Sequence, residues 1–349
     1  MLSTDNRIAL LMHEGTTSNR GKTGLAMLRY SAIPIVAVID YTCAGQSLPQ
    51  LTKINRDVPI VASVKDALSY SPDVLAIGIA PSGGGLPEAW YEEVKQSIAA
   101  GLSLVNGLHT TMAEDPALKS QLQPHQWIWD VRREPPGLTV GTGQARGLPC
   151  KRVLAVGTDM SVGKMSANLE LHRASLNRGL RSKVIATGQT NLMLGDDGVA
   201  LDAVRVDFAS GAVEQQVMRY GNDVDILYIE GQGSLLNPAS TATLPLLRGS
   251  QPTHLILVHR AGQNHIQNFP EVPIPPLPEV ISLYEAVATA GGAFTNTKIV
   301  GIALNTGHLD DADAKRAIAE TQEITQLPTT DVVRLGADLL LDAVLADKP

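Results

Sequence analysis

Residues Val153–Leu180 read VLAVGTDMSVGKMSANLELHRASLNRGL, and this stretch decides the fold. It opens with a short apolar run of strand type, Val153–Val156. A turn carrying Gly157 and Gly163 follows, and then Lys164 and apolar residues at helical spacing. Strand, glycine loop, lysine and helix are the parts of a phosphate-binding loop, in which backbone N–H groups, a helix N-terminus and an ammonium converge on an anion. The alternative is a glycine-rich turn without a ligand.

The loop departs from the common Walker A spacing in two ways. Five residues, instead of four, separate its two glycines. Met165 follows the lysine and Ser166 comes only after it, so the hydroxyl that usually binds Mg²⁺ is missing. We therefore expect a loop that holds phosphate and is poorly suited to hydrolyse ATP. The residues predicted to bind the nucleotide are Gly157, Thr158, Ser161, Gly163, Lys164, Met165 and Ser166.

Composition indicates a globular protein with two domains. The chain has 349 residues, of which 44% are hydrophobic and 18% charged, and this length accommodates two cores of ordinary size. A net charge of −7 argues against a general binder of nucleic acid or anionic membranes. Two cysteines make no disulfide framework. No signal peptide and no run of about 20 apolar residues is recognised, so a cytoplasmic location is expected.

Short apolar runs alternate with helical patterns before residue 150. This alternation of strand and helix patterns predicts an α/β fold with a doubly wound, Rossmann-like N-terminal domain over 1–149, followed by a P-loop domain over 150–349. The linker between them is rich in proline and glycine. The expected strands are Ile8–Met12, Ile35–Ile39, Pro59–Ala62, Val74–Ile79 and Leu102–Leu108, and the expected helices are Thr23–Tyr30, Val64–Ser69 and Pro87–Ala100.

Ligands of such sheets bind at the carboxyl ends of the strands. Glycines in PSGGGLPE, residues 81–88, would let a backbone approach a phosphate or carboxylate. His109 follows a strand and is either a structural or a catalytic residue. Asp40 is either a ribose ligand or a turn residue. No GxGxxG motif is present, so a dinucleotide oxidoreductase is disfavoured. The other loops at this edge are 14–23 and 106–111.

In the C-terminal domain, an acidic residue stands at the end of a second strand. Glu230 follows the apolar strand Ile226–Ile229 and precedes the turn Gly231–Ser234, which is where a Walker B carboxylate belongs. The alternative is a carboxylate that only caps the turn. Asn305 ends a later strand and is a candidate to contact adenine. Further expectations are a helix over Phe208–Tyr220 with Asp207 as its N-cap, and a last strand over Asp331–Arg334.

Several motifs resemble known families. GTDMSVGK is similar to the GTDxxxxGK loop of dethiobiotin synthetases, and IEGQGSLLNPAS is similar to their VEGAGG segment. The whole chain, with GTDxxVGKM, ATGQT, DAVxxDFxxGAVE and IEGQGSLxxP, resembles the D-glutamate N-acetyltransferase family, formerly a domain of unknown function. This resemblance implies transfer of acetyl from acetyl-CoA to the amine of D-glutamate, a small amino-acid substrate. A homo-oligomer is expected as well.

Acyl transfer to an amine needs a general base and donors for the developing oxyanion. Glu230, Asp207 and His259 are the candidate bases, in that order, and the turn at Gly231 and Gly233 supplies candidate N–H donors. No cysteine lies in a motif of the second domain, so direct transfer is expected. The predicted contacts to the substrate are Arg260, Arg205 and Gln189.

Two other functions remain open from the sequence. The dethiobiotin-synthetase likeness alone suggests an ATP-dependent ligase or carboxylase, with Mg²⁺ on Asp207 and Glu230 and ATP in the loop. Met165 counts against it, although Ser166 or a water molecule can substitute for the missing hydroxyl. The third reading is a nucleotide sensor without turnover. Nucleotide turnover would separate the ligase from the transferase, and ligand binding alone would indicate the sensor.

Overall fold

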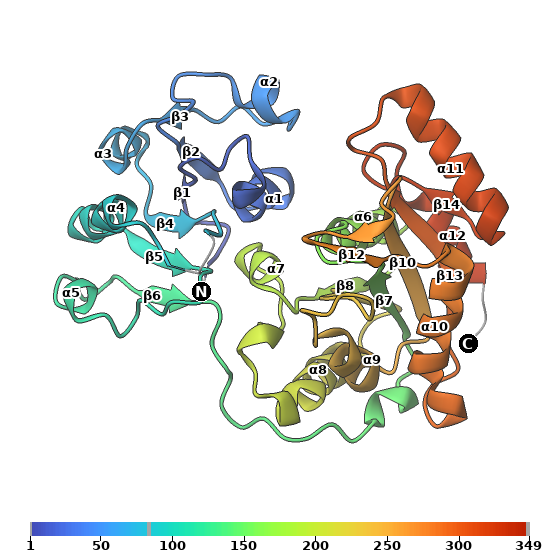
Figure 1. Cartoon of the computed structure of the whole chain (residues 1–349). Coiled ribbons are helices and arrows are strands. Elements are labelled where there is room, and N and C mark those ends of the chain that lie inside the picture. Colours follow the sequence, from blue (N-terminus) through green and yellow to red (C-terminus); the bar gives the residue numbers. More distant parts are fainter. Residues whose placement is uncertain (1, 82–84, 347–349) are drawn as a thin grey trace. The chain divides into compact units, whose positions relative to one another are not determined.

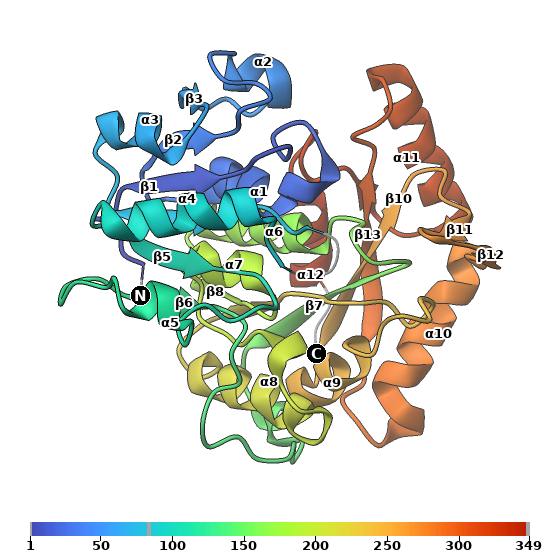
Figure 2. The same cartoon turned by 60° about the vertical axis from the view of Figure 1, so that its left-hand side comes forward.

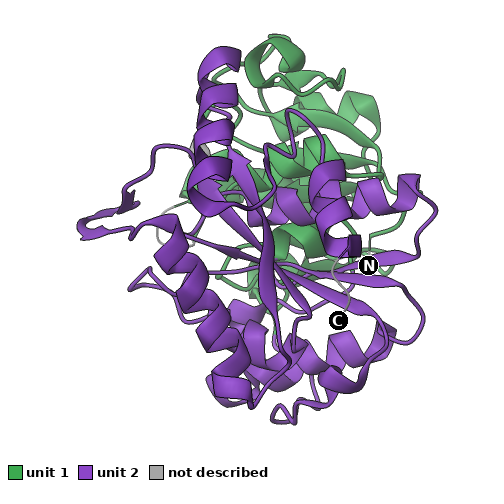
Figure 3. Cartoon of the chain, turned by 90° about the vertical axis from the view of Figure 1, so that its right-hand side faces the viewer, with its two compact units in different colours: residues 1–133, 189–196 green, residues 134–188, 197–349 purple. Residues whose placement is uncertain are grey.

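The computed structural model describes residues 2–81 and 85–346, which fold into two compact α/β units (Figure 1). The first unit contains residues 2–133 and 189–196, and the second contains 134–188 and 197–346 (Figure 3). The expected α/β class is confirmed. The expected division between residues 149 and 150 stays a prediction. Part of the PSGGGLPE loop, residues 82–84, lies outside the described residues.

The first unit is built on a parallel sheet of six strands in the order β3-β2-β1-β4-β5-β6. This is the strand order of dinucleotide-binding Rossmann folds. Strands β1, β4 and β5 are buried throughout, as expected of a parallel sheet covered on both faces. The strands are β1 Ile8–Leu11, β2 Ile35–Ile39, β3 Ile60–Val61, β4 Val74–Ile77, β5 Ser103–Asn106 and β6 Ile128–Asp130.

Helices of the first unit bury one apolar side each. In α4, Trp90, Val94 and Ile98 recur at helical spacing and are buried, and the helix packs on β5 (Figure 2). Side-chain caps begin the short helices α3 and α5, through Ser63 and Asp115. The helices are α1 Lys22–Tyr30, α2 Leu48–Thr52, α3 Val64–Ala67, α4 Glu88–Ala99, α5 Pro116–Lys119 and α7 Gln189–Met193.

The second unit contains a parallel sheet in the order β14-β13-β10-β7-β9-β8, so that β7 and β10 lie at its centre. An antiparallel hairpin, β11–β12, follows β10. The strands are β7 Lys151–Gly157, β8 Ser182–Ile185, β9 Ile226–Ile229, β10 His254–Arg260, β11 His265–Ile266, β12 Phe269–Pro273, β13 Lys298–Asn305 and β14 Thr329–Thr330.

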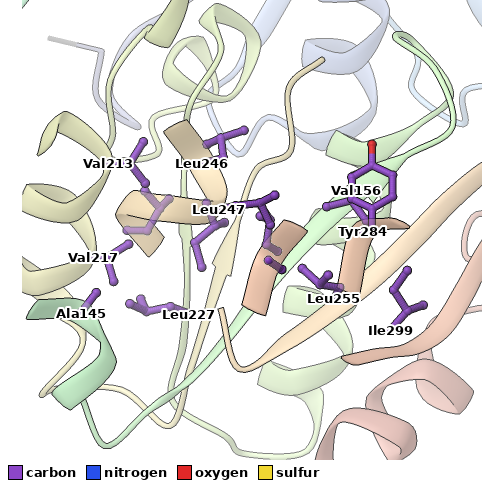
Figure 4. Close-up of a cluster of buried hydrophobic side chains, with 14 of the residues drawn as sticks. Ala145, Val156, Val213, Val217, Leu227, Leu246, Leu247, Leu255, Tyr284 and Ile299 are labelled. Carbon is purple, nitrogen blue, oxygen red and sulfur yellow. The ribbon is translucent and has the colours of Figure 1, made fainter. Parts of the chain in front are cut away.

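Two apolar clusters cover the faces of this sheet because neighbouring strand residues point to opposite sides. Leu154 and Val156 of β7 join a cluster with α8, α9 and α10 (Figure 4), whereas Val153 and Ala155 join one with α6 and α12. The helices are α6 Lys164–Asn177, α8 Val206–Tyr220, α9 Thr243–Ser250, α10 Leu277–Thr289, α11 Asp311–Thr325 and α12 Asp338–Ala346.

Two local expectations are wrong. Residues 331–334 form a turn and not a strand, because the carboxylate of Asp331 accepts the N–H groups of Val333 and Arg334, both at 3.0 Å, and curls the chain. Helix α8 begins at Val206, so its N-cap is Arg205, and Asp207 lies inside the first turn.

Candidate functional site

The predicted phosphate-binding loop is formed between β7 and α6. Strand β7 ends at Gly157, and α6 begins at Lys164. Ser161 and Gly163 have φ angles of 58° and 119°, in the left-handed region, and Gly163 is the N-cap. A residue with a side chain would be strained at the second of these angles. The loop therefore turns sharply from a central strand into a helix whose N-terminus faces the carboxyl edge of the sheet.

Lys164 is held inside this loop. Its side chain is buried, and its Nζ donates a hydrogen bond to the carbonyl oxygen of Asp159 at 2.7 Å. A Cβ atom on Gly157 would lie 3.0 Å from that Nζ. A Cβ atom on Gly231 would lie 2.9 Å from the lysine Cδ and 1.7 Å from the carbonyl oxygen of Ala155. Glycine at both positions leaves the room that the lysine needs.

Asp159, which was not among the predicted site residues, organises the loop. Its side chain is fully buried, and its two oxygens accept hydrogen bonds at 2.6–2.7 Å. The donors lie in the loop itself, in the turn after β9 and beside the β11–β12 hairpin: the N–H of Met160, the side chains of Asn237 and Gln263, and the N–H of Gln267. An acidic residue two positions after the first glycine was the available sequence signal.

Two further side chains hold the loop by hydrogen bonds to its backbone carbonyl oxygens. The hydroxyl of Tyr284 donates to the carbonyl oxygen of Gly157 at 2.7 Å. Asn305 ends β13, where its Nδ2 donates to the carbonyl oxygen of Val162 at 2.9 Å and its Oδ1 accepts from Gly307 at 3.1 Å. The end of β13 therefore places Asn305 against the loop. Its contact with adenine stays a prediction.

Glu230 lies at the end of β9 and joins it to the end of β8. Its carboxylate is buried, and one oxygen accepts the N–H groups of Thr187 and Gly188, both at 2.9 Å. The Thr187 hydroxyl donates to the Glu230 carbonyl oxygen at 2.8 Å. The next residue in the chain, Gly231, packs on the side chain of Lys164. Glu230 is therefore the direct sequence neighbour of a residue that contacts the lysine.

His259 and Arg260 end β10, the other central strand. The Nδ1 atom of His259 is 2.9 Å from the hydroxyl of Thr158 in the loop. Burial lowers the pKa of His259 to about 4, so its ring is neutral at pH 7. Arg260 is exposed and lies opposite Asn305 in the pairing of β10 with β13. Both predicted residues are therefore placed at the loop edge of the sheet.

Three predicted residues have no hydrogen bond to the loop within the described part of the chain. Arg205 instead forms an ion pair with Glu134 at 2.7 Å, and its guanidinium lies 4.7 Å from the ring centre of Phe208. Asp207 is exposed in the first turn of α8. Gln189 belongs to the first unit, where its Cγ would lie 3.4 Å from a Cβ atom on Gly107.

The DAVxxDFxxGAVE motif has a structural explanation. The buried carboxylate of Glu214 accepts hydrogen bonds from the N–H of Thr142 at 2.6 Å and the N–H of Gln144 at 2.5 Å. A Cβ atom on Gly211 would lie 1.8 Å from the carbonyl oxygen of Thr139. These two residues of α8 bind the segment that precedes β7.

The described residues show neither a ready-made metal site nor a membrane span. Over 2–81 and 85–346, no group of three or more His, Cys, Asp or Glu is arranged to hold a metal ion. Within the same ranges, every helix is too short or too polar to cross a bilayer.

Comparison with known proteins finds one family over both units. Residues 139–341 match a P-loop domain of unknown function, DUF1611, and residues 41–134 match its Rossmann-like N-terminal companion. A D-glutamate N-acetyltransferase from Tritonibacter scottomollicae is 36% identical over 81% of this chain and 84% of its own length. One from a Pseudoalteromonas species is 31% identical over 80% and 83%, respectively.

A solved structure resembles the whole chain. It is the crystal structure of a DUF1611 family protein from Anabaena variabilis ATCC 29413, which is 66% identical. The match covers 98% of this chain and 100% of that one, with a TM-score of 0.96. Both the Rossmann-like and the P-loop expectations of the sequence are thereby confirmed.

Proposed function

Because the chain belongs to the DUF1611 family, we propose that it is an N-acetyltransferase that moves acetyl from acetyl-CoA to the amine of an amino acid, D-glutamate being the first candidate. The observation that carries this proposal is the likeness, over most of the chain, to two proteins named D-glutamate N-acetyltransferase. The geometry of the loop supports it.

The loop suits a phosphate-bearing donor. Coenzyme A carries a diphosphate and a 3′-phosphate, which the N-terminus of α6 and the ammonium of Lys164 attract electrostatically. Met165 follows the lysine in place of the usual metal-binding hydroxyl. This supports binding of a nucleotide that is not hydrolysed.

The chemical step requires a neutral amine and a polarised thioester. The amine nitrogen forms a bond to the acetyl carbon, the carbon–sulfur bond breaks, and the amine proton passes to a base, which returns it to the departing sulfur so that CoA leaves as the thiol. We assign Glu230 as that base, because its carboxylate is buried one residue from the contact between Gly231 and Lys164. We assign the backbone N–H groups of the turn at Gly231 and Gly233 as hydrogen-bond donors to the oxyanion that develops on the thioester oxygen.

His259 is a weaker candidate for the base. Its contact with Thr158 fits a residue that positions the loop. Asp207 is exposed on α8, and no observed contact connects it to the loop within the described residues.

Calorimetry with acetyl-CoA, CoA and ATP, each with and without Mg²⁺, tests the donor. The parent is compared with Lys164→Met, which removes the charge and keeps the bulk, and with Lys298→Met, which removes an exposed lysine at the far end of β13. We expect metal-independent acetyl-CoA binding that only Lys164→Met loses, and thiol release on addition of D-glutamate. Mg²⁺-dependent ATP binding without any response to CoA would favour the ligase instead.

A further inference from the structure

The turn after Glu230 carries a glutamine whose side chain lies against the same glycine as the carboxylate. A Cβ atom on Gly188 would lie 2.3 Å from Nε2 of Gln232 and 3.3 Å from Oε1 of Glu230. The carboxamide nitrogen and this carboxylate oxygen therefore both lie close to one point above Gly188. The N–H of the same glycine donates to the other oxygen of Glu230, Oε2, at 2.9 Å. All three residues belong to the second unit, in the segments that follow β8 and β9.

The backbone of this turn is held in place on both sides of Gln232. The hydroxyl of Thr243 donates to the carbonyl oxygen of Gln232 at 3.1 Å. Gly233 has a φ angle of 70°, in the left-handed region, and a Cβ atom on it would lie 1.9 Å from Oγ of Ser240. Gly231 packs on the carbonyl oxygen of Ala155. The position from which the Gln232 side chain extends is therefore set by the fold, as a specific binding group requires.

The carboxamide of Gln232 is available to a ligand. Gln232 is half-buried, and over residues 2–81 and 85–346 its carboxamide forms no hydrogen bond, with Glu230 or with any other residue. A half-buried glutamine ordinarily bonds water, and Gln232 differs from such a residue by lying over a glycine together with the buried carboxylate of Glu230. A small polar ligand can therefore bond the Gln232 carboxamide without breaking an existing hydrogen bond of the protein.

The two side chains suit the two polar groups of an α-amino acid. Such a molecule carries an amine and a carboxylate on the same carbon atom. A carboxylate side chain accepts from the amine, whereas a carboxamide N–H donates to a carboxylate oxygen. We propose that Gln232 is a specificity-determining residue, whose Nε2 donates to the α-carboxylate of the acceptor and so places the amine at Glu230. This role rests on the proposed function, in which Glu230 is the base.

The proposal also explains why a glycine stands at position 188. Gly188 is the glycine of the ATGQT motif, and Gln232 is the glutamine of IEGQGS, so the two motifs meet here. The φ angle of Gly188 is not in the left-handed region, so its backbone conformation is open to other residues. Any Cβ atom at this position would instead displace the Gln232 carboxamide, at 2.3 Å. Glycine is thus required for the position of that side chain.

Steady-state kinetics on the full chain test this role. Thiol release at saturating acetyl-CoA and varied D-glutamate gives KM and kcat separately for the parent, Gln232→Leu and Gln232→Glu. Leucine removes the donor, whereas glutamate keeps the shape, offers only acceptors and repels a carboxylate. We expect KM for D-glutamate to rise about 10- to 100-fold in both variants, with unchanged acetyl-CoA binding by calorimetry. The control is Gln216→Leu, at a half-buried glutamine of α8, which should keep the parental KM.

Gly188→Ala provides a second test, because it displaces the carboxamide without removing it. It should raise KM for D-glutamate in the parent and leave KM unchanged when added to Gln232→Leu. A parental KM in either Gln232 variant, or additive effects of Gly188→Ala and Gln232→Leu on KM, would overturn the role of Gln232 and leave the proposed transferase intact. If the parent itself transfers no acetyl to D-glutamate, the proposed function fails, and the role of Gln232 fails with it.

Discussion

The hydroxyl of Tyr284 donates a hydrogen bond to the carbonyl oxygen of Gly157 at 2.7 Å, although the two residues are 127 positions apart. The same oxygen atom of Tyr284 accepts the N–H of Leu235 at 3.1 Å. The tyrosine is fully buried on α10 among the apolar side chains of Figure 4, and burial raises its pKa, so the hydroxyl keeps its proton. One side chain thereby joins the first glycine of the phosphate loop to the turn after β9.

Tyr284→Phe should lower both stability and affinity. It leaves a buried carbonyl and an N–H without their partner, which costs about 1–3 kcal/mol of unfolding free energy. Acetyl-CoA binding should weaken because the loop is no longer fixed. Tyr228→Phe is the control, since its buried hydroxyl bonds Ser175 and not the loop. Urea unfolding and calorimetry check both effects, and equal affinities in the two variants would contradict the role of Tyr284.

Two glutamines beside the hairpin offer a matched pair. Gln263 reaches Asp159 with its side chain, whereas Gln267 uses its backbone N–H. Gln263→Ala should therefore weaken acetyl-CoA binding, because it removes one charge-assisted hydrogen bond of about 1.5–3 kcal/mol, which corresponds to at most roughly 10–150-fold in affinity. Gln267→Ala keeps its bond and should bind like the parent. If both variants bind equally well, the Asp159 network does not set the shape of the loop.

Gly211→Ala tests the attachment of the segment before β7. The added methyl group would lie 1.8 Å from the carbonyl oxygen of Thr139, so the backbone must shift. We expect a loss of about 1–3 kcal/mol in unfolding free energy, measured by urea titration. Gly147→Ala is the control, because no atom lies within 4 Å of its Cβ position. An unchanged unfolding free energy in Gly211→Ala would contradict this prediction, because the segment at Thr139 would then move away without loss of stability.

Glu230→Gln tests the proposed base. The amide keeps the size of the side chain but cannot take up the amine proton, so turnover should fall by about 10²–10⁴-fold while acetyl-CoA binding is retained. Glu214→Gln is the control, a second buried carboxylate of the same unit that binds the linker. Initial rates of thiol release with D-glutamate measure the effect. Unchanged turnover in Glu230→Gln would remove it as the base.

His259 should make stability depend on pH. Its pKa falls from 6.5 to about 4 on burial, so between these values the unfolded chain binds a proton that the folded protein does not. Stability from this group is complete above pH 6.5 and is lost as pH falls towards 4, by up to ~3 kcal/mol. The difference in unfolding free energy between the parent and His259→Asn should therefore change between pH 7.5 and 5. If the difference in unfolding free energy stays the same over this pH range, the pKa of His259 is not lowered by folding.

Local sequence patterns determined the P-loop itself, the alternation of strands and helices, and the strand-end positions of Glu230, His259 and Asn305. These features depend on residues within one strand–turn–helix unit, where spacing, glycine conformation and burial act on neighbours. The same reasoning failed at 331–334, since a strand pattern does not reveal that the Asp331 carboxylate will curl the chain.

Only the tertiary structure decided which distant residues serve the loop. Asp159 accepts a hydrogen bond from a side chain beside the hairpin, and Tyr284 donates one to Gly157. Arg205 forms an ion pair with Glu134 and not with the loop. Each of these contacts joins segments that are far apart in the chain, and their meeting depends on the order of strands and on which helix covers which face. The sequence by itself determined the family and the phosphate cradle, whereas the packing of the sheet decided which polar groups surround it.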